Sequence, residues 1–157
     1  MDDVQAAINR MHILGTMSRY AHGIDTAQYE LVGGCFTDDG VLRVPKSPEL
    51  EGPSDICSKL SVAGKKRREV GGQIFQRHSL SLSRIEIDGG VASAETYFHV
   101  ITELGLDHSG RYVDKIRKVG GKWLFQERQV FVEYIKLKSR FMSPQLAEVA
   151  IVDTAGQ

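Results

Sequence analysis

Apolar side chains in the N-terminal quarter of the chain recur at steps of three and four residues, the spacing of one face of a helix. This pattern predicts a long first helix that ends at Gly23, with acidic Asp2 and Asp3 at its start, where a helix dipole favours negative charge. The apolar stripe consists of Ala6, Ile13, Met17, Tyr20 and Ile24.

A second, shorter helix is expected over about residues 26–36, although Gly33 and Gly34 weaken it. The run Thr37–Gly40 has the composition of a turn, and residues 41–44 have that of a short strand.

Gly52-Pro53 predicts the start of a third helix, because proline is well tolerated in a first helical turn. Gly64 is expected to end this helix. The basic run 65–68 that follows is interpreted as a solvated loop, with an anion-attracting rim as the alternative.

From residue 73 onward the pattern changes to alternation between apolar and polar side chains, the period of a strand. The alternation predicts four strands, with a hairpin turn at Asp88–Gly90 and a longer turn over 104–109. The predicted strands cover residues 73–87, 91–103, 111–119 and 122–135.

Three helices followed by a meander of long strands predict an α+β domain over residues 1–135. The helices would cover one face of a strongly curved, mixed or antiparallel sheet and so form a cone that encloses a pocket. Residues 136–157 are expected to be a C-terminal tail that closes the pocket or lies at an oligomer interface, with a short helix from Ser143-Pro144 to about Ala150. A mainly apolar cavity with a few convergent polar groups is the usual form of a small-molecule site.

The amino-acid composition of the chain disfavours several classes of function. Lys plus Arg and Asp plus Glu both number 20 among the 157 residues, so the formal charge is zero and a dedicated nucleic-acid binder is disfavoured. No apolar run approaches the roughly 20 residues that cross a membrane, and the first 30 residues do not resemble a signal peptide. Cys35 and Cys57 lack a Cys-x-x-Cys spacing, which fits buried, reduced thiols in a cytoplasmic protein.

His78 is the strongest catalytic candidate. It shares a predicted strand face with Leu80 and Leu82, so it should point toward the core, either as a general base or as a histidine satisfied by a backbone carbonyl. Asp25 is either the carboxylate partner of such a base or the N-cap of the second helix, in a capping box with Gln28.

Other polar residues fall on faces that should be apolar. Tyr20 belongs to the helical stripe, and its hydroxyl needs a partner if it is buried. Arg128 shares a strand face with Leu124, Val130 and Val132, so it either serves a ligand or forms a buried ion pair with a carboxylate. The carboxylates considered for that pair are those of Asp114 and Glu95.

Alternation also groups Tyr97 with His99 on one strand face, and Tyr112 with Asp114 on another. Alternation alone does not say which of these faces is inside. His12, His22 and His108 are expected to be exposed. The chain shows no metal-ligand spacing, no phosphate-binding loop and no Gly-x-Ser-x-Gly, which disfavours metal, nucleotide and serine-nucleophile chemistry.

Several short motifs together resemble SnoaL-like domains of the nuclear-transport-factor-2-like superfamily, over about residues 5–135. These motifs are Tyr20 to Asp25, Cys35 to Gly40, Gly52-Pro53 with Ile56, His78-x-Leu80, Ile85 to Gly89, Ala92, Gly110 to Asp114, Gly121 to Trp123 and Arg128. The resemblance implies a cystatin-like α+β barrel. It is specific for the fold and weak for the reaction, since this fold hosts many functions.

Within the superfamily the chain is most similar to the dehydratase and elimination group, which includes scytalone dehydratase, bile-acid 7α-dehydratase and hexachlorocyclohexane dehydrochlorinase. The resemblance implies a lyase without metal or organic cofactor, acting on a small hydrophobic cyclic, aromatic or steroid-like molecule. It places Asp25 and His78 as the catalytic dyad, with Tyr20 as a further catalytic group. Substrate binding is expected from Arg128, His99, Tyr97 and Tyr112.

Two other functions fit the same fold. A ketosteroid-isomerase-like enzyme would use Asp25 as the base and His78 as an electrophile, and polyketide cyclases belong with it. A non-catalytic binding domain or partner subunit, like the β subunits of ring-hydroxylating dioxygenases, is the third. Four aromatic residues of the predicted strands are too many for one core, so some of them should lie on the outer face of the sheet. These four residues are Phe75, Trp123, Phe125 and Phe131. An apolar outer face predicts a homodimer or homotrimer packed through it.

Overall fold

The computed structural model describes residues 3–71, 75–139 and 141. The described residues form three helices and seven strands, which confirms the α+β class. The helices are α1 (Asp3–Asp25), α2 (Tyr29–Gly33) and α3 (Gly52–Gly71). The strands are β1 (Phe36–Arg43), β2 (Leu50–Glu51), β3 (Gln76–Leu80), β4 (Arg84–Asp88), β5 (Val91–Thr102), β6 (Gly105–Val119) and β7 (Lys122–Ile135). The strand β2 was not predicted, and the single strand expected over 73–87 is divided into β3 and β4.

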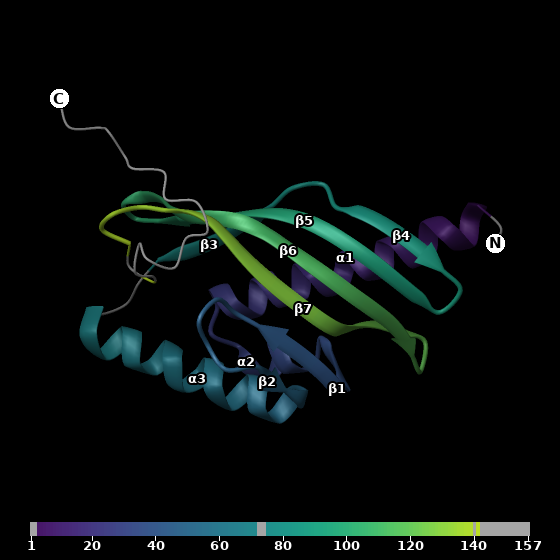
Figure 1. Ribbon diagram of the computed structural model, residues 1–157, viewed down its shortest axis with the longest axis horizontal. Helices are drawn as coiled ribbons and strands as arrows, with labels where there is room; N and C mark the ends of the chain where they lie inside the picture. The colour runs from purple at the N-terminus through teal and green to yellow at the C-terminus, as the bar shows by residue number, and fades with distance from the viewer. Residues whose placement is uncertain (1–2, 72–74, 140, 142–157) are drawn as a thin grey trace.

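The strands form one curved, unclosed sheet in the order β2-β1-β7-β6-β5-β3. The remaining strand, β4, pairs with residues 91–95 of β5, whereas β3 pairs with residues 98–102 of the same strand. All neighbours are antiparallel except β1 and β7, so the sheet is mixed, as predicted. The long strands β5, β6 and β7 bend together over α1, while α3 lies beside α2 and the short strands β1 and β2 (Figure 1). This curvature makes the concave interior that positions the candidate site.

The helix boundaries differ from those predicted. α2 is a single short turn of helix, and Phe36 already belongs to β1. α3 runs through Gly64 to Gly71, so the basic run 65–68 lies on a helix rather than in a loop. Gly64 does not end the helix because it serves packing: a Cβ there would collide with the hydroxyl of Tyr29.

The predicted turn at Thr37–Gly40 is wrong, because these residues lie inside β1. The register between β1 and β7 shifts between Phe36 and Val41, so the turn-like residues form an irregular stretch of strand. The long predicted strand from residue 73 is interrupted instead: β3 ends at Leu80, and Leu82 is 97% exposed rather than inward-facing. The predicted tail helix from Ser143 lies outside the described residues.

A β-bulge in β7 changes which side chains face the core. Lys115 pairs with Glu127 and Ile116 pairs with Phe125, so Gln126 has no direct partner. An unpaired extra residue reverses the alternation on either side of it. Trp123 and Phe125 are therefore buried on the same side as Arg128, which corrects their predicted place on the outer face.

A second bulge lies between β5 and β6. Val100 pairs with His108 and Ile101 pairs with Leu106, which leaves Asp107 as the extra residue. Asp107 is buried as a result, at 2% exposure, beside His108, which is 6% exposed and lies on the same buried face as Tyr112 and Asp114. The predicted turn over 104–109 and the predicted exposure of His108 are both wrong, because β6 already begins at Gly105.

The core contains an ion pair at its centre. Arg128 donates two hydrogen bonds to the carboxylate of Asp114, at 2.8 and 2.7 Å, and both side chains are fully buried. Three aromatic rings enclose the guanidinium, with centroids 3.9 Å (Phe125), 4.2 Å (Tyr112) and 4.3 Å (Tyr20) from its carbon. Burial alone disfavours the charged form, but the Asp114 carboxylate more than compensates and raises the pKa of Arg128 above its ordinary value.

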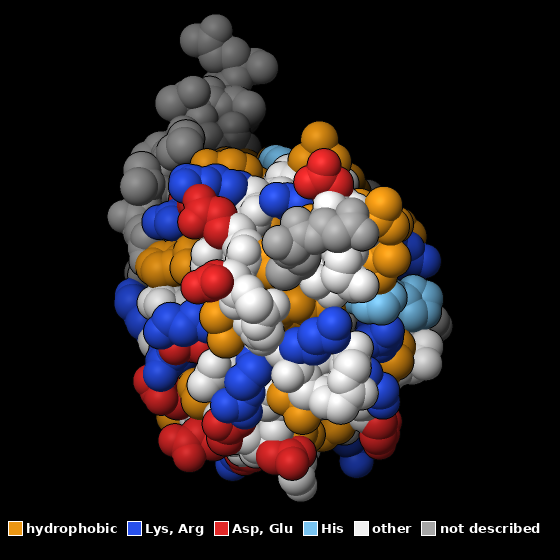
Figure 2. All heavy atoms as spheres, turned by 90° about the vertical axis from the view of Figure 1, so that its right-hand side faces the viewer, with side chains coloured by type: hydrophobic (Ala, Val, Ile, Leu, Met, Phe, Trp, Pro, Cys, Tyr) orange, Lys and Arg blue, Asp and Glu red, His pale blue; other side chains and the backbone are white. Residues whose placement is uncertain are grey.

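On the face that Figure 2 shows, lysine and arginine side chains are interspersed with acidic and hydrophobic ones. This mixture agrees with the formal charge of zero. Within the described part of the chain, none of the helices combines the length and the apolar character needed to cross a bilayer.

We expect Asp114→Asn to lower the free energy of unfolding by about 3–5 kcal/mol, because it leaves the buried Arg128 guanidinium without its counter-charge. Urea unfolding followed by circular dichroism measures this. The matched control is Glu86→Gln, which breaks the exposed pair with Arg84 and should cost less than about 1 kcal/mol. Equal losses for the two variants would contradict a central role for the buried pair.

Candidate functional site

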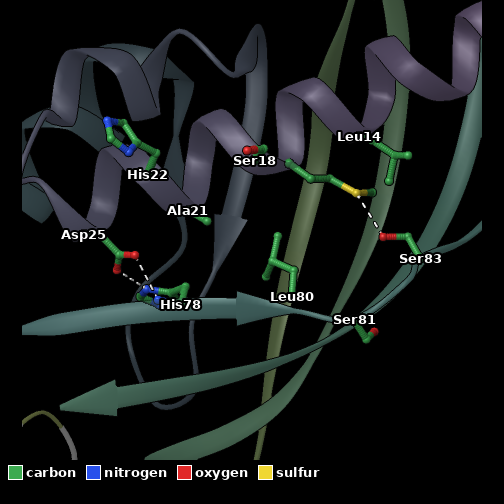
Figure 3. Close-up of a pocket in the computed structure, with 10 residues that line it drawn as sticks. Leu14, Ser18, Ala21, His22, Asp25, His78, Leu80, Ser81 and Ser83 are labelled. Atoms are coloured by element: carbon green, nitrogen blue, oxygen red, sulfur yellow. Dashed lines mark hydrogen bonds and ion pairs between the residues drawn. The ribbon is translucent and has the colours of Figure 1, made fainter.

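Asp25 and His78 meet where the end of α1 crosses the edge strand β3 (Figure 3). The Asp25 carboxylate makes two contacts with His78: Oδ1 lies 2.6 Å from the ring Nδ1, and Oδ2 accepts the backbone N–H at 2.9 Å. The two side chains are only 8% and 10% exposed. One carboxylate therefore fixes both the position of the residue and the orientation of its ring.

This geometry resolves two alternatives left open by the sequence. The neighbour of the His78 ring is a carboxylate, not the backbone carbonyl of a purely structural histidine. Asp25 does not cap α2 either, since Gln28 occupies that position and forms no side-chain cap. A neutral His78 that donates from Nδ1 to Asp25 keeps a lone pair on Nε2, which is the arrangement of a general base.

His78 lines a small inner cavity, of about 110 Å³, on the concave side of the sheet. Most of the cavity wall is apolar, from Ile24, Val44, Leu60, Phe98, Val100 and Val130. The polar groups are gathered at a few points, which is the usual composition of a small-molecule site. On the other side of the dyad, a groove of about 410 Å³ lies between α1 and the segment from β3 to Ser83 (Figure 3).

Tyr20 and Tyr112 also line the inner cavity, where the apolar stripe of the first helix places Tyr20 and where the family resemblance implies a role for Tyr112. Burial raises the pKa of Tyr20 to about 12, although the nearby Arg128 guanidinium works against the shift. Burial likewise raises the pKa of Tyr112 well above its ordinary value. Both phenols are therefore protonated near neutral pH and available as hydrogen-bond donors.

Arg128 does not line the cavity, because it lies fully buried behind the two tyrosines. Its pairing with Asp114 matches the ion-pair alternative considered from the sequence. Arg128 can therefore influence a ligand only through the rings that cover it.

The structure does not bring Tyr97 and His99 to the cavity. Thr96, Phe98 and Val100 are the buried side of β5, so the alternating residues Tyr97 and His99 face outward and are exposed. The prediction that these two residues bind substrate inside the cone is therefore not supported.

The sequence did not point to four polar residues that line the cavity: Tyr29, Arg67, Gln76 and His108. His108 was missed because residues 104–109 were expected to form a turn, and Arg67 because its helix was expected to end at Gly64. Arg67, Arg68 and Arg77 line a wider groove of about 560 Å³ at the mouth of the cone. The basic run thus lies at the rim of a groove, which agrees with the alternative interpretation of that run.

Phe141 belongs to the lining of both the inner cavity and the mouth groove. Its ring lies 6.0 Å from that of His108 and 5.4 Å from the guanidinium carbon of Arg67. Across residues 3–71, 75–139 and 141, no three His, Cys, Asp or Glu side chains are grouped so as to hold a metal ion.

The profile of the SnoaL-like domain family matches residues 5–129, which is most of the chain. No curated protein sequence matches this chain.

Solved structures confirm the fold. A protein of unknown function with a cystatin-like fold from Nostoc punctiforme has a TM-score of 0.70 and 22% identity, over 81% of this chain and 92% of that one. A protein provisionally named scytalone dehydratase, from Novosphingobium aromaticivorans, has a TM-score of 0.69 and 19% identity, over 84% and 88%.

From the same organism, the β subunit of a provisionally named aromatic-ring-hydroxylating dioxygenase has a TM-score of 0.68 and 18% identity, over 83% and 93%. Identities this low establish a common fold and no common activity.

We expect Asp25→Asn to change the tautomer of His78. The asparagine has one acceptor oxygen, which the fixed backbone N–H of His78 requires, so its NH₂ group would face Nδ1 and move the ring proton to Nε2. Long-range ¹⁵N–¹H correlation spectra of the histidine rings measure the tautomer, with His108 as the internal control. An unchanged His78 tautomer would show that Asp25 does not set it.

Proposed function

The chain belongs to the SnoaL-like domain family, and we propose that it is a cofactor-independent lyase that eliminates water or another leaving group from a small hydrophobic carbonyl compound. The observation that carries this proposal is the Asp25–His78 pair at the wall of a mainly apolar cavity. A base held at Nδ1 and open at Nε2 is suited to removing a proton from carbon.

In the proposed reaction, Nε2 of His78 takes a proton from the carbon next to the substrate carbonyl. The electrons of that C–H bond form an enolate, whose oxygen accepts a hydrogen bond from Tyr20. The enolate then restores the carbonyl, forms the new C=C bond and expels the leaving group from the β carbon. Asp25 stabilises the imidazolium that His78 becomes.

The cavity limits the size of the group that reacts. A cavity of roughly 150 Å³ holds one benzene molecule, so the inner cavity of about 110 Å³, which is smaller, accommodates a short chain or the reacting edge of a ring. A polycyclic substrate would place its remaining rings in the mouth groove, which shares Tyr29, Gln76 and Phe141 with the inner cavity. Tyr112 contributes to binding at the inner end.

Using Asp25 as the base, as an isomerase would, is less compatible with the geometry. Both of its oxygens contact His78, so neither is directed at a substrate. A non-catalytic binding role is the outcome that the first experiment below separates from the lyase.

We also propose that the chain forms a homodimer or homotrimer through the outer face of the sheet. With Trp123 and Phe125 in the core, the apolar part of that face consists of exposed Tyr97, Ile101 and Val113. These residues lie on the adjacent strands β5 and β6.

Replacing His78 with Ala should lower the rate of α-proton exchange about 10²–10⁴-fold, the usual contribution of a general base. Proton NMR in deuterated water, with a panel of hydrophobic β-hydroxy ketones and enones, measures both α-deuteration and alkene formation. The control is His99→Ala, an exposed histidine of the outer face, which should exchange at the wild-type rate. A panel compound that binds but is never deuterated would favour a binding role.

Tyr20→Phe should lower kcat about 10²–10³-fold, because it removes one donor to the developing enolate oxygen. Tyr97→Phe, which removes the same hydroxyl from the outer face, should leave kcat unchanged. Steady-state kinetics on the panel compound that reacts fastest compare the two variants. If both retain full activity, Tyr20 acts only in packing.

A further inference from the structure

The cavity contains a second imidazole–carboxylate pair, formed by two consecutive residues of β6. Nδ1 of His108 lies 2.8 Å from Oδ1 of Asp107, and both side chains are buried. The same Asp107 oxygen accepts a hydrogen bond from the hydroxyl of Ser139 at 2.6 Å, which fixes the carboxylate. This arrangement repeats the contact between Asp25 and Nδ1 of His78.

The sheet register places the two histidines opposite each other across one strand. Val100 of β5 pairs with His78 of β3 on one side and with His108 of β6 on the other. Two strand spacings separate the backbones of the histidines by about 10 Å. Both side chains line the inner cavity, and both rings lie beside Phe98, with centroid distances of 6.4 and 6.0 Å.

We propose that His108 is the catalytic acid that protonates the leaving oxygen, while His78 removes the proton from carbon. This inference rests on the proposed lyase function and adds the step that the Asp25–His78 pair does not supply. Hydroxide is a poor leaving group, so its departure needs a proton donor. The His108 imidazolium can donate from Nε2 while Asp107 accepts from Nδ1 and stabilises the charge.

The removal of the proton from carbon and the departure of the oxygen balance in protons and electrons. His78 gains the proton from carbon, and the C–H electrons become the C=C bond as the C–O bond breaks. The oxygen leaves with the bond electrons and takes the proton of His108, so water departs. His78 is then charged and His108 neutral, and transfer of one proton through water restores the starting state.

The position of His108 fits a role in catalysis better than a purely structural role. A histidine that only anchored Ser139 through Asp107 would have no reason to line the cavity or to face a second base there. Among the described residues, none forms a hydrogen bond with Nε2 of either ring. Both nitrogens are therefore left for a ligand that lies between them.

The geometry also defines the substrate class more narrowly. The acidic C–H and the leaving oxygen must be on neighbouring carbons, so that one molecule contacts both imidazoles. A β-hydroxy ketone has this arrangement, with its carbonyl directed at Tyr20 and Tyr112.

The test compares two probes that differ only in the leaving group. The first is the aldol of benzaldehyde and acetone, which loses water to give benzalacetone. The second is the 4-nitrophenyl ether of that aldol, which releases 4-nitrophenolate and gives the same product. Nitrophenolate is stable without a proton, so its loss needs the base but not the acid.

His108→Gln should lower the dehydration of the aldol about 10²–10⁴-fold, yet it should keep α-deuteration and nitrophenolate release within a few-fold of wild type. His78→Gln should lose all three reactions together. His99→Gln is the matched control and should change none of them. Circular dichroism and thermal melts establish that each variant is folded, and Asp107→Asn replaces His108→Gln if that variant is not.

Other outcomes overturn the proposal. Equal loss of activity on both probes in the His108 variant would assign His108 a structural role. Dehydration of the aldol at the wild-type rate would show that His108 has no role in the reaction. Wild-type protein that deuterates the aldol but never dehydrates it would reject His108 as the acid and leave His78 as the base. Wild-type protein that does not exchange α protons would reject the proposed function itself, and this inference with it.

Discussion

The buried guanidinium of Arg128 organises the interior of this protein, because a cation removed from water needs compensating partners. Arg128 of β7 is paired with Asp114 of β6 and enclosed by rings from α1, β6 and β7. The pair thereby links the long helix to the two central strands. Two of these rings, those of Tyr20 and Tyr112, also line the cavity, so the ion pair of the core lies directly behind the wall of the site.

Irregularities in the sheet decide which residues reach that site. Extra residues at Gln126 and Asp107 bend the long strands and reverse the alternation of inward and outward side chains. Without the first, Arg128 would not share a buried side with Trp123 and Phe125. Without the second, Asp107 would not be buried beside His108. The curvature that makes the cone and the placement of its polar groups therefore have the same cause.

The sequence predicted those features that depend on regular periodicity. The bounds of β7, the hairpin before β5 and the inward positions of Tyr20 and His78 agree with the structure. It failed at Trp123, because the extra residue Gln126 resets the alternation between Trp123 and Arg128. It failed at His108, because a turn was expected over residues 104–109 where β6 has already begun. It also failed at Gly64, where the absence of a side chain permits Tyr29 to pack against the helix rather than ending it. Glycine can end a helix or permit close packing within one, and the residue type alone does not distinguish the two.

The contact between Asp25 and the backbone of His78 has a consequence for the behaviour of the protein in solution. β3 is the last strand on its side of the main sheet, and its outward N–H groups form an open edge that another chain could extend. The Asp25 carboxylate occupies the N–H of His78 and places a negative charge beside that edge. The residue that orients the ring of His78 thus also opposes the addition of a strand from another chain at this edge.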